Sequence, residues 1–288
     1  MLEACFQHPL RHECGFTRQD FLRHVGISRQ AQHQQRNRLR RRVGEEAIVL
    51  DMVRAIRYYH PRMGTRKLLV KLQPLLAVRG ISLGRDALFD LLRRHDLLVP
   101  TRRRWQKTTR AGLWRCPNLL PELTVTAPCQ LWVGDVTYLT SENGFAYLAL
   151  LTDAYSRFIV GFDLSLSLAV EGCLRALNSA LEQARGSLTG LVHHSDHGVQ
   201  YTAHAYRNLL SEHDIRPSMG EVGNCYENAL AERMNGILKL EYGLGDVFVD
   251  LEQMMASTTE AITLYNYDRP HLALDYRVPA EVHFARHL

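Results

Sequence analysis

Apolar positions follow two different periods along the chain, and the period changes near residue 128. Before that point, apolar residues recur at helical spacing, and Gly64, Gly80 and Gly84 separate the runs. The recurring residues are Leu68, Leu69, Leu72, Leu75 and Leu76 in one run and Ala87, Leu88, Leu91 and Leu92 in the next. After that point, short segments rich in Val, Leu, Tyr and Phe predict strands. The pattern therefore predicts small helical units followed by a domain that contains a sheet.

Strands and helices alternate in this second part. Strands are predicted over residues 130–141, 144–157, 158–167, 190–196 and 215–219. Helices are predicted over residues 169–185, 203–214 and 226–242. Strands interleaved with helices imply a mixed sheet that is covered on both faces. The predicted fold class is therefore α/β, with a mixed five-stranded sheet and small all-α domains ahead of it.

Residues 17–42 have the outline of a helix-turn-helix. Thr17 is a passable start for a first helix, Gly26 makes the turn, and Ser28 is a good N-cap for a second helix. Arginines crowd the end of the second helix, namely Arg36, Arg38, Arg40, Arg41 and Arg42. They would repel one another unless phosphates or solvent screened them. Two short amphipathic helices of any origin fit the same pattern, so DNA contact and a solvated basic face both remain open.

The pattern divides the chain into four parts. Residues 1–44 are expected to form the basic helix-turn-helix-like segment and 45–100 a second helical, DNA-binding domain. Residues 101–127 are expected to be a basic linker, and 128–288 the α/β core with C-terminal helices. The linker carries Arg102, Arg103 and Arg104 next to Trp105, and it either follows a DNA backbone or is simply solvated.

Charge is distributed unevenly between these parts. Residues 1–116 carry 25 Lys or Arg against 9 Asp or Glu, whereas the remainder carries 10 against 21. A basic segment of this kind indicates a polyanionic partner, of which nucleic acid is the obvious one, although a solvated basic face is the alternative. There is no apolar run of membrane-spanning length and no apolar signal core, so a cytoplasmic protein without a membrane partner is expected. The six cysteines are scattered, which argues against a zinc site.

Two acids interrupt or end apolar strands. Asp135 lies inside "LWVGDVTYL", and Asp196 ends "GLVHHSD". A buried, ionised carboxylate costs several kcal/mol unless a cation compensates it. The neighbouring His193, His194 and His197 do not complete a zinc site, because adjacent strand positions point to opposite faces. Asp196 is therefore either part of a polar turn or a residue held in place for chemistry.

A third acid lies on the last helix of the core. At about 100° per residue, Asn228, Asn235 and Lys239 fall within about 60° of Glu232. The apolar residues Leu230, Met234, Ile237 and Leu238 fall on the opposite side. This stripe suits phosphoryl chemistry, although a solvated face would look similar. Two magnesium ions about 4 Å apart need several carboxylates from separate elements, and Asp135, Asp196 and Glu232 meet that need.

Four longer motifs give a resemblance. The motifs are "WVGDVTYL", "HHSDHGVQY", "SMGEVGNCYENALAERMNGILKLE" and "YNYDRPHLAL", and 35 residues separate Asp196 from Glu232. Their order and spacing resemble the second-frame (OrfB) transposases of IS-three-type insertion sequences, which carry the D, D-35-E signature shared with retroviral integrases. The segment "HPRMGTRKLLVKL" is similar to that family's helical domain ahead of the catalytic core.

The resemblance implies an RNase H-like core in which Asp135, Asp196 and Glu232 bind two divalent ions, Mg²⁺ or Mn²⁺. It implies DNA contacts at Lys239, Arg233 and Asn228, and supporting roles for Asn224, Arg269 and His271. The implied reaction is cleavage at transposon ends followed by strand transfer of the freed 3′-hydroxyl into DNA. The implied partners are transposon-end and target DNA, a first-frame (OrfA) protein or fusion, and further copies of the chain. A nuclease that only hydrolyses, or a DNA-binding regulator without catalysis, is the alternative.

Overall fold

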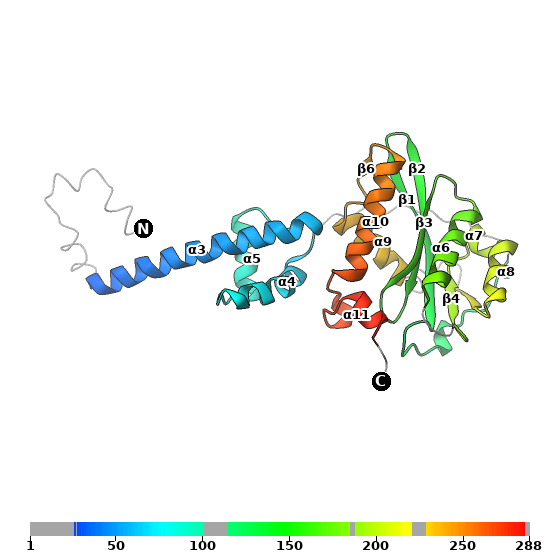
Figure 1. Ribbon diagram of the computed structural model, residues 1–288, viewed down its shortest axis with the longest axis horizontal. Coiled ribbons are helices and arrows are strands. Elements are labelled where there is room, and N and C mark those ends of the chain that lie inside the picture. The colour runs from blue at the N-terminus through cyan, green and yellow to red at the C-terminus, as the bar shows by residue number, and fades with distance from the viewer. Residues whose placement is uncertain (1–25, 27, 101–113, 185–187, 221–228, 286–288) are drawn as a thin grey trace.

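The computed structural model describes residues 26, 28–100, 114–184, 188–220 and 229–285. In this part of the chain, a helical unit precedes a larger α/β domain (Figure 1). Several predictions lie outside the described residues. These are the first helix of the helix-turn-helix, before Gly26, and the side chains Arg102, Arg103, Arg104, Asn224 and Asn228.

The helical unit consists of α3 (Arg29–Tyr59), α4 (Thr65–Val78) and α5 (Arg85–Arg94). Ser28 is the N-cap of α3, as predicted, and its hydroxyl accepts a hydrogen bond from the Ala31 amide at 3.1 Å. One core holds the unit together and consists of Val49, Leu50, Val53, Met63, Leu68, Leu72, Leu76, Leu88, Leu91 and Leu92. The leucine spacing therefore predicted α4 and α5 correctly. The first half of α3 contributes nothing to this core and projects away from the rest of the molecule (Figure 1).

Helix α3 is continuous over 31 residues. The predicted domain boundary between residues 44 and 45 lies inside this helix. The helix continues through Gly44, because a single glycine inside a helix is tolerated. The division at that position therefore stays a prediction. Neither α3 nor any other helix in the described part of the chain combines the length and the apolar content needed to cross a membrane.

The α/β domain is built on one mixed sheet with the strand order β3-β2-β1-β4-β5. The strands are β1 (Leu131–Ser141), β2 (Gly144–Asp153), β3 (Ile159–Ser165), β4 (Val192–Ser195), β5 (Arg216–Met219) and β6 (Val247–Phe248). The first three are antiparallel neighbours, whereas β4 is parallel to both β1 and β5. This arrangement is the RNase H-like fold. The predicted number of five strands is wrong by one, because β6, which pairs with the end of β1, is too short to produce a periodic signal.

Helices cover both faces of the sheet (Figure 1). One face carries α6 (Val170–Gln183), α7 (Val199–Thr202) and α8 (His204–Glu212), and the other carries α9 (Ala229–Glu241) and α10 (Leu251–Tyr267). Short elements complete the domain, namely η2 (Leu120–Glu122), η3 (Leu272–Leu274) and α11 (Pro279–His283). The predicted order of strands and helices from residue 130 to 242 is confirmed.

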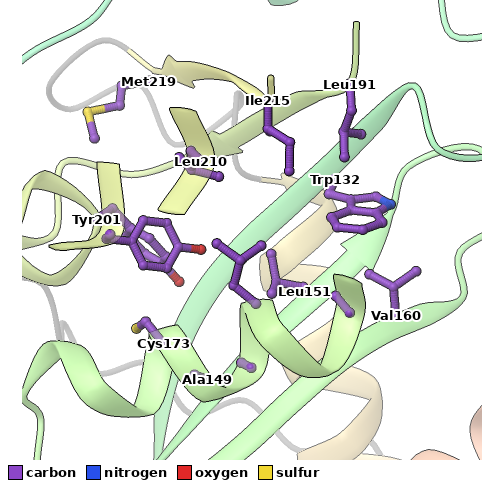
Figure 2. Packing of buried hydrophobic residues seen from close by; sticks show 14 of the residues in the cluster. Trp132, Ala149, Leu151, Val160, Cys173, Leu191, Tyr201, Leu210, Ile215 and Met219 are labelled. Atoms are coloured by element: carbon purple, nitrogen blue, oxygen red, sulfur yellow. The ribbon is translucent and has the colours of Figure 1, made fainter. Parts of the chain in front are cut away.

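Side chains of β1 alternate between these two faces. Trp132 points into the cluster under α6 and α8, which Figure 2 shows with Leu151, Val160 and Leu210 around it. Leu139 belongs to the cluster under α9 and α10 instead. Leu139 comes four residues after Asp135, so the two side chains point to the same face of the strand. Asp135 is therefore on the α9 face of the sheet.

Residues 114–127 belong to the α/β domain rather than to a solvated linker. Leu119, Leu120 and Leu123 pack against the apolar cluster at the start of β1. The guanidinium carbon of Arg207 lies 4.8 Å from the centroid of the Trp114 ring. The predicted linker therefore extends too far toward the C-terminus, because the apolar residues of "NLLPELTV" pack against the start of the sheet.

Candidate active site

Asp135 and Asp196 meet at one edge of two parallel strands. Val133 of β1 pairs with His194 of β4, and the same offset continued by two residues puts Asp135 opposite Asp196. Neighbouring strands are about 4.8 Å apart, and residues that pair in a parallel ladder point to the same face. The two carboxylates are therefore neighbours just where the pairing of β1 and β4 ends.

Asp196 follows β4 in a tight turn. Its Oδ1 accepts a hydrogen bond from the Gly198 amide at 2.9 Å. A Cβ on Gly198 would lie 2.9 Å from the same oxygen, which is closer than real contacts allow. Glycine at position 198 therefore lets the backbone approach the carboxylate, which explains the glycine two residues after the acid. Sequence reasoning did not assign this role to Gly198.

Helix α9 brings the third acid to the same place. Its buried residues include Met234, Ile237 and Leu238, the apolar face that helical periodicity predicts. On the other side, Asn235 Nδ2 donates a hydrogen bond to Asp135 Oδ2 at 2.5 Å. Glu232, one turn before Asn235, is exposed, and its charge acts on Asp135. The predicted polar stripe of α9 thus faces the acids of the sheet.

The electrostatics of Asp135 reflect this crowding. Burial, reinforced by the like charges of Asp196 and Glu232, raises the pKa of Asp135 to about 7, although hydrogen bonds from the Val136 backbone and Asn235 act in the opposite direction. The half-buried Asp135 side chain is therefore poorly stabilised as an anion by the protein alone. A cation at this edge of the sheet would stabilise it.

Lys239 supplies a positive charge near the acids. Its ammonium nitrogen lies 4.5 Å from the centroid of the Tyr138 ring, which is on β1. Burial lowers the pKa of Lys239, whereas the charge of Asp135 raises it. Lys239 is two turns after Glu232, as predicted, and it is part of the same surface.

The three acids do not form a closed ligand cluster. Within the described residues, no group of three or more His, Cys, Asp and Glu side chains lies close enough together to hold a metal ion. Asp135 is instead engaged by Asn235, whose own Oδ1 is buried and has no hydrogen-bond partner. The donors present are carboxylate and amide oxygens, the types that Mg²⁺ and Mn²⁺ prefer, and the orphaned Asn235 oxygen is a polar atom that such a site would use.

The neighbouring histidines have structural roles. His193 is buried, its Nε2 is 3.0 Å from the Tyr206 hydroxyl, and burial lowers its pKa to about 3. His194 Nδ1 is 3.0 Å from the Ser218 hydroxyl on the next strand. These contacts give His193 and His194 partners within the α/β domain.

The predicted DNA contacts and supporting residues are widely separated. Exposed arginines line the projecting half of α3, namely Arg38, Arg40, Arg41 and Arg42, with Arg36 half-buried. Arg233 is exposed on α9. Arg269 binds Glu241 rather than any of the three acids. The pKa of His271 is lowered to about 4, mainly by burial and in addition by the charge of Arg269.

Two family models match the α/β domain. Both are described as "Integrase core domain", and they cover residues 125–225 and 213–279. Together with the strand order and the acids at the edge of the sheet, they define the class of the molecule as an integrase-type polynucleotidyl transferase.

Curated relatives narrow this class. The chain is 35% identical over 244 residues to an insertion element IS600 uncharacterized 31 kDa protein of Shigella sonnei. The matched region covers 83% of this chain and 88% of that protein. The chain is 35% identical to a putative transposase for insertion sequence element IS986/IS6110 of Mycobacterium tuberculosis, over 66% of this chain and 71% of that protein. It is also 35% identical to transposase InsF for insertion sequence IS3A of Escherichia coli, over 67% of this chain and 65% of that protein. The chain therefore belongs to the IS3-type insertion-sequence transposases, DNA transposases with an integrase-like catalytic core.

Solved structures with a similar fold come from retroviral systems. One is the HTLV-2 integrase catalytic core domain in complex with magnesium (trimeric form), with 18% identity and a TM-score of 0.43, covering 55% of this chain and 97% of that chain. Another is the simian T-cell lymphotropic virus intasome in complex with PP2A regulatory subunit B56 gamma, with 15% identity and a TM-score of 0.48, covering 81% of this chain and 75% of that chain.

Proposed function

We propose that Asp135, Asp196 and Glu232 are the metal-binding catalytic residues of this transposase. The observation that carries the proposal is the register of β1 and β4, because its offset, continued by two residues, brings Asp135 beside Asp196, whose charge acts on Asp135. The hydrogen bond from Asn235 ties α9 to the same carboxylate. The raised pKa of Asp135 supports a site that needs a cation.

The three acids would hold two Mg²⁺ or Mn²⁺ ions. When bound, such ions activate a water or a hydroxyl group and stabilise the charge that develops on the phosphate. The protein's own part is to hold the donor oxygens in place. The Gly198 amide orients Asp196, the Asn235 amide orients Asp135, and the Asn235 carbonyl oxygen is available for a ligand. Lys239, whose charge interacts with that of Asp135, would contact a DNA phosphate beside the acids.

Two phosphoryl transfers follow from this site. In the first, a water oxygen bonds to the phosphorus at the transposon end, the bond from phosphorus to the 3′-oxygen breaks, and that oxygen leaves as a 3′-hydroxyl. In the second, this hydroxyl bonds to a target phosphorus and displaces the target's own 3′-oxygen, so one phosphodiester replaces another. Neither transfer needs a protein nucleophile, so Tyr138 and Tyr201 have no covalent role.

The partners follow from the same reaction. Transposon ends and target DNA must be bound together, and we expect the basic half of α3 to hold DNA through its arginines. Joining two ends to one target calls for more than one active site, so a homo-multimer on DNA is expected. A first-frame (OrfA) protein, separate or fused, is the further expected partner.

A strand-joining assay tests the proposal. The protein is supplied with a labelled oligonucleotide that carries one end of its element, a target plasmid, and Mg²⁺ or Mn²⁺. We expect metal-dependent appearance of label in the plasmid. Cleavage without joining would indicate a nuclease, and binding without either reaction would indicate a regulator, so both results would contradict the proposal.

A further inference from the structure

Among the described residues, the helical unit contacts the α/β domain through a polar cluster at the end of α9, and Arg62 adds an ion pair with Asp246 at 3.0 Å. Lys67 of α4 donates a hydrogen bond to Glu241 Oε1 at 2.6 Å, and the backbone amide of Arg62 donates to the Glu241 carbonyl at 3.2 Å. Figure 1 shows the end of α3 next to α9 and α10. The helical unit therefore satisfies both the side chain and the backbone of the last residue of α9.

A second set of contacts lies beside the first. His60, the C-cap of α3, has its Nε2 2.7 Å from Asp268 Oδ2 and its Nδ1 3.1 Å from the Tyr242 hydroxyl. Lys71 forms an ion pair with the same Asp268. Asp268 follows the end of α10, so the cluster holds the ends of both helices that cover this face of the sheet.

Arg269 completes the cluster from within the α/β domain. Its Nε and one terminal nitrogen donate to the two carboxylate oxygens of Glu241, both at 2.9 Å. Only 2% of the Arg269 side chain is exposed, against 15% for Lys67 and 20% for Glu241. Burial opposes ionisation of Glu241, but the hydrogen bonds from Arg269 and Lys67 outweigh it and lower its pKa. Breaking one member of such a group leaves another charge buried without its partner.

The position of Glu241 breaks a rule of helix electrostatics. An acid at the C-terminus of a helix is unfavourable, because the carbonyl end of the helix dipole is negative. Glu241 is tolerated there because Arg269 and Lys67 surround it. At about 100° and 1.5 Å per residue, Glu241 lies on the opposite side of α9 from Glu232, about 14 Å along the helix. One side of α9 thus faces the acids, and its end is held by the helical unit.

We propose that Lys67, Glu241 and Arg269 are positioning residues for strand transfer. They contact one another rather than Asp135, Asp196 or Glu232, and they fix the axial position and rotation of the helix that carries Glu232 and Lys239. A displacement of about 1 Å at reacting groups can cost about 10²-fold in rate. This proposal rests on the proposed function, because it gives Glu232 and Lys239 their roles at the phosphate. It assigns the helical unit a part in building the active site, besides holding DNA.

Lys67 offers the sharpest test, because it is the residue of the helical unit that binds the Glu241 carboxylate directly. Lys67→Met keeps the length of the side chain and removes its charge, whereas Lys67→Arg keeps the charge. We expect Lys67→Met to lower the joining rate at saturating end DNA by about 10-fold or more, with affinity for the DNA unchanged within about 2-fold. Lys67→Arg should recover the rate to within about 3-fold. Lys67→Gln, which keeps a donor for Glu241, replaces the methionine variant if that protein does not fold.

A matched control separates positioning from loss of any ion pair. Arg175 of α6 forms a bidentate pair with Asp163 of β3 inside the α/β domain, on the face away from α9. Arg175→Gln should join DNA at the wild-type rate. Unchanged joining by Lys67→Met, or a loss seen only in DNA affinity, would overturn the positioning proposal. Asp196→Asn is measured in parallel. If Asp196→Asn still joins DNA, the proposed function fails. If Asp196→Asn is inactive and Lys67→Met is fully active, only the positioning proposal fails.

Discussion

Acidic side chains of the helical unit and those at the edge of the sheet are arranged in opposite ways. In the helical unit, acids lie beside arginines, in the pairs Glu45–Arg41, Glu46–Arg42, Glu46–Arg94, Asp51–Arg54, Asp86–Arg85 and Asp90–Arg93. The hydrogen bond from Arg94 lowers the pKa of Glu46. At the edge of the sheet, burial and the neighbouring acids raise the pKa of Asp135. Exposed pairs of the first kind contribute little to stability, whereas crowded acids cost stability until a cation joins them.

The difference assigns separate tasks to the two regions. These acids of the helical unit already have arginine partners, and the unit carries more arginines than acids, so we expect it to attract phosphates. The acids of the sheet edge are compensated only in part, by the Asn235 amide and by Lys239. We therefore expect the first region to determine DNA affinity and the second to determine chemistry.

The largest effect is expected at Asp196. Asp196→Asn keeps the shape of the side chain but removes the charge that a metal ion requires. Strand joining should fall by about 10³-fold or more, while binding of end DNA stays within about 2-fold of wild type. Joining products on gels and mobility-shift titrations measure the two properties. The control is Asp214→Asn, an exposed acid of the same domain whose positive φ suits asparagine, and it should join normally. Retained joining by Asp196→Asn would remove Asp196 from the mechanism.

A smaller effect is expected from substitutions on α3, and it should appear in DNA affinity rather than in the joining reaction. Replacing Arg38 and Arg40, which are exposed on the projecting half of α3, by Gln together should weaken binding of specific and random DNA alike, by about 10-fold at moderate salt. If each arginine neutralises one phosphate, the slope of log affinity against log salt should drop by about 2. Arg54→Gln, on the same helix but beyond the basic run, is the matched control. An unchanged salt slope in the double variant would show that these arginines face solvent in the complex.

A third prediction concerns stability without metal. The folded pKa of Asp135, about 7, lies above its usual value of 3.8, so the folded protein holds more protons than the unfolded chain between these pH values. Stability should therefore fall as pH rises from about 4 to about 7. Asp135→Asn should raise the thermal midpoint by a few °C at pH 8 and leave it nearly unchanged at pH 4. Scanning calorimetry in chelator measures both, and a lowered midpoint at pH 8 would contradict the electrostatic account.

Local periodicity carried most of what could be predicted. The polar stripe of α9 depends on spacing within 13 residues, so it was predicted with its buried face, including Met234, Ile237 and Leu238. The strands were recognised from similarly local patterns, including the strand that Asp196 directly follows. The neighbourhood of Asp135 and Asp196 was not predictable from spacing, because it depends on which strands pair and in what register.

Long-range contacts escaped prediction for the same reason. Arg269 and Glu241 are 28 positions apart, and Lys67 and Glu241 are 174 apart, so no local pattern connects them. The motif that contains Arg269 suggested support for the active site, but not through a helix end. Residues 114–127 were predicted as linker because their apolar positions have no regular period, although they pack on the start of β1.

The central claim is that Asp135 helps to hold a divalent cation at the edge of the sheet. Electron paramagnetic resonance of Mn²⁺ tests it directly, with titrations of wild type, Asp135→Asn and the control Asp214→Asn at pH 8. We expect wild type and Asp214→Asn to bind Mn²⁺ with equal affinity, and Asp135→Asn to bind it at least about 10-fold more weakly. Binding of Mn²⁺ by wild type should weaken at pH 6, because Asp135 becomes protonated. Equal Mn²⁺ affinity of Asp135→Asn and wild type would contradict the account.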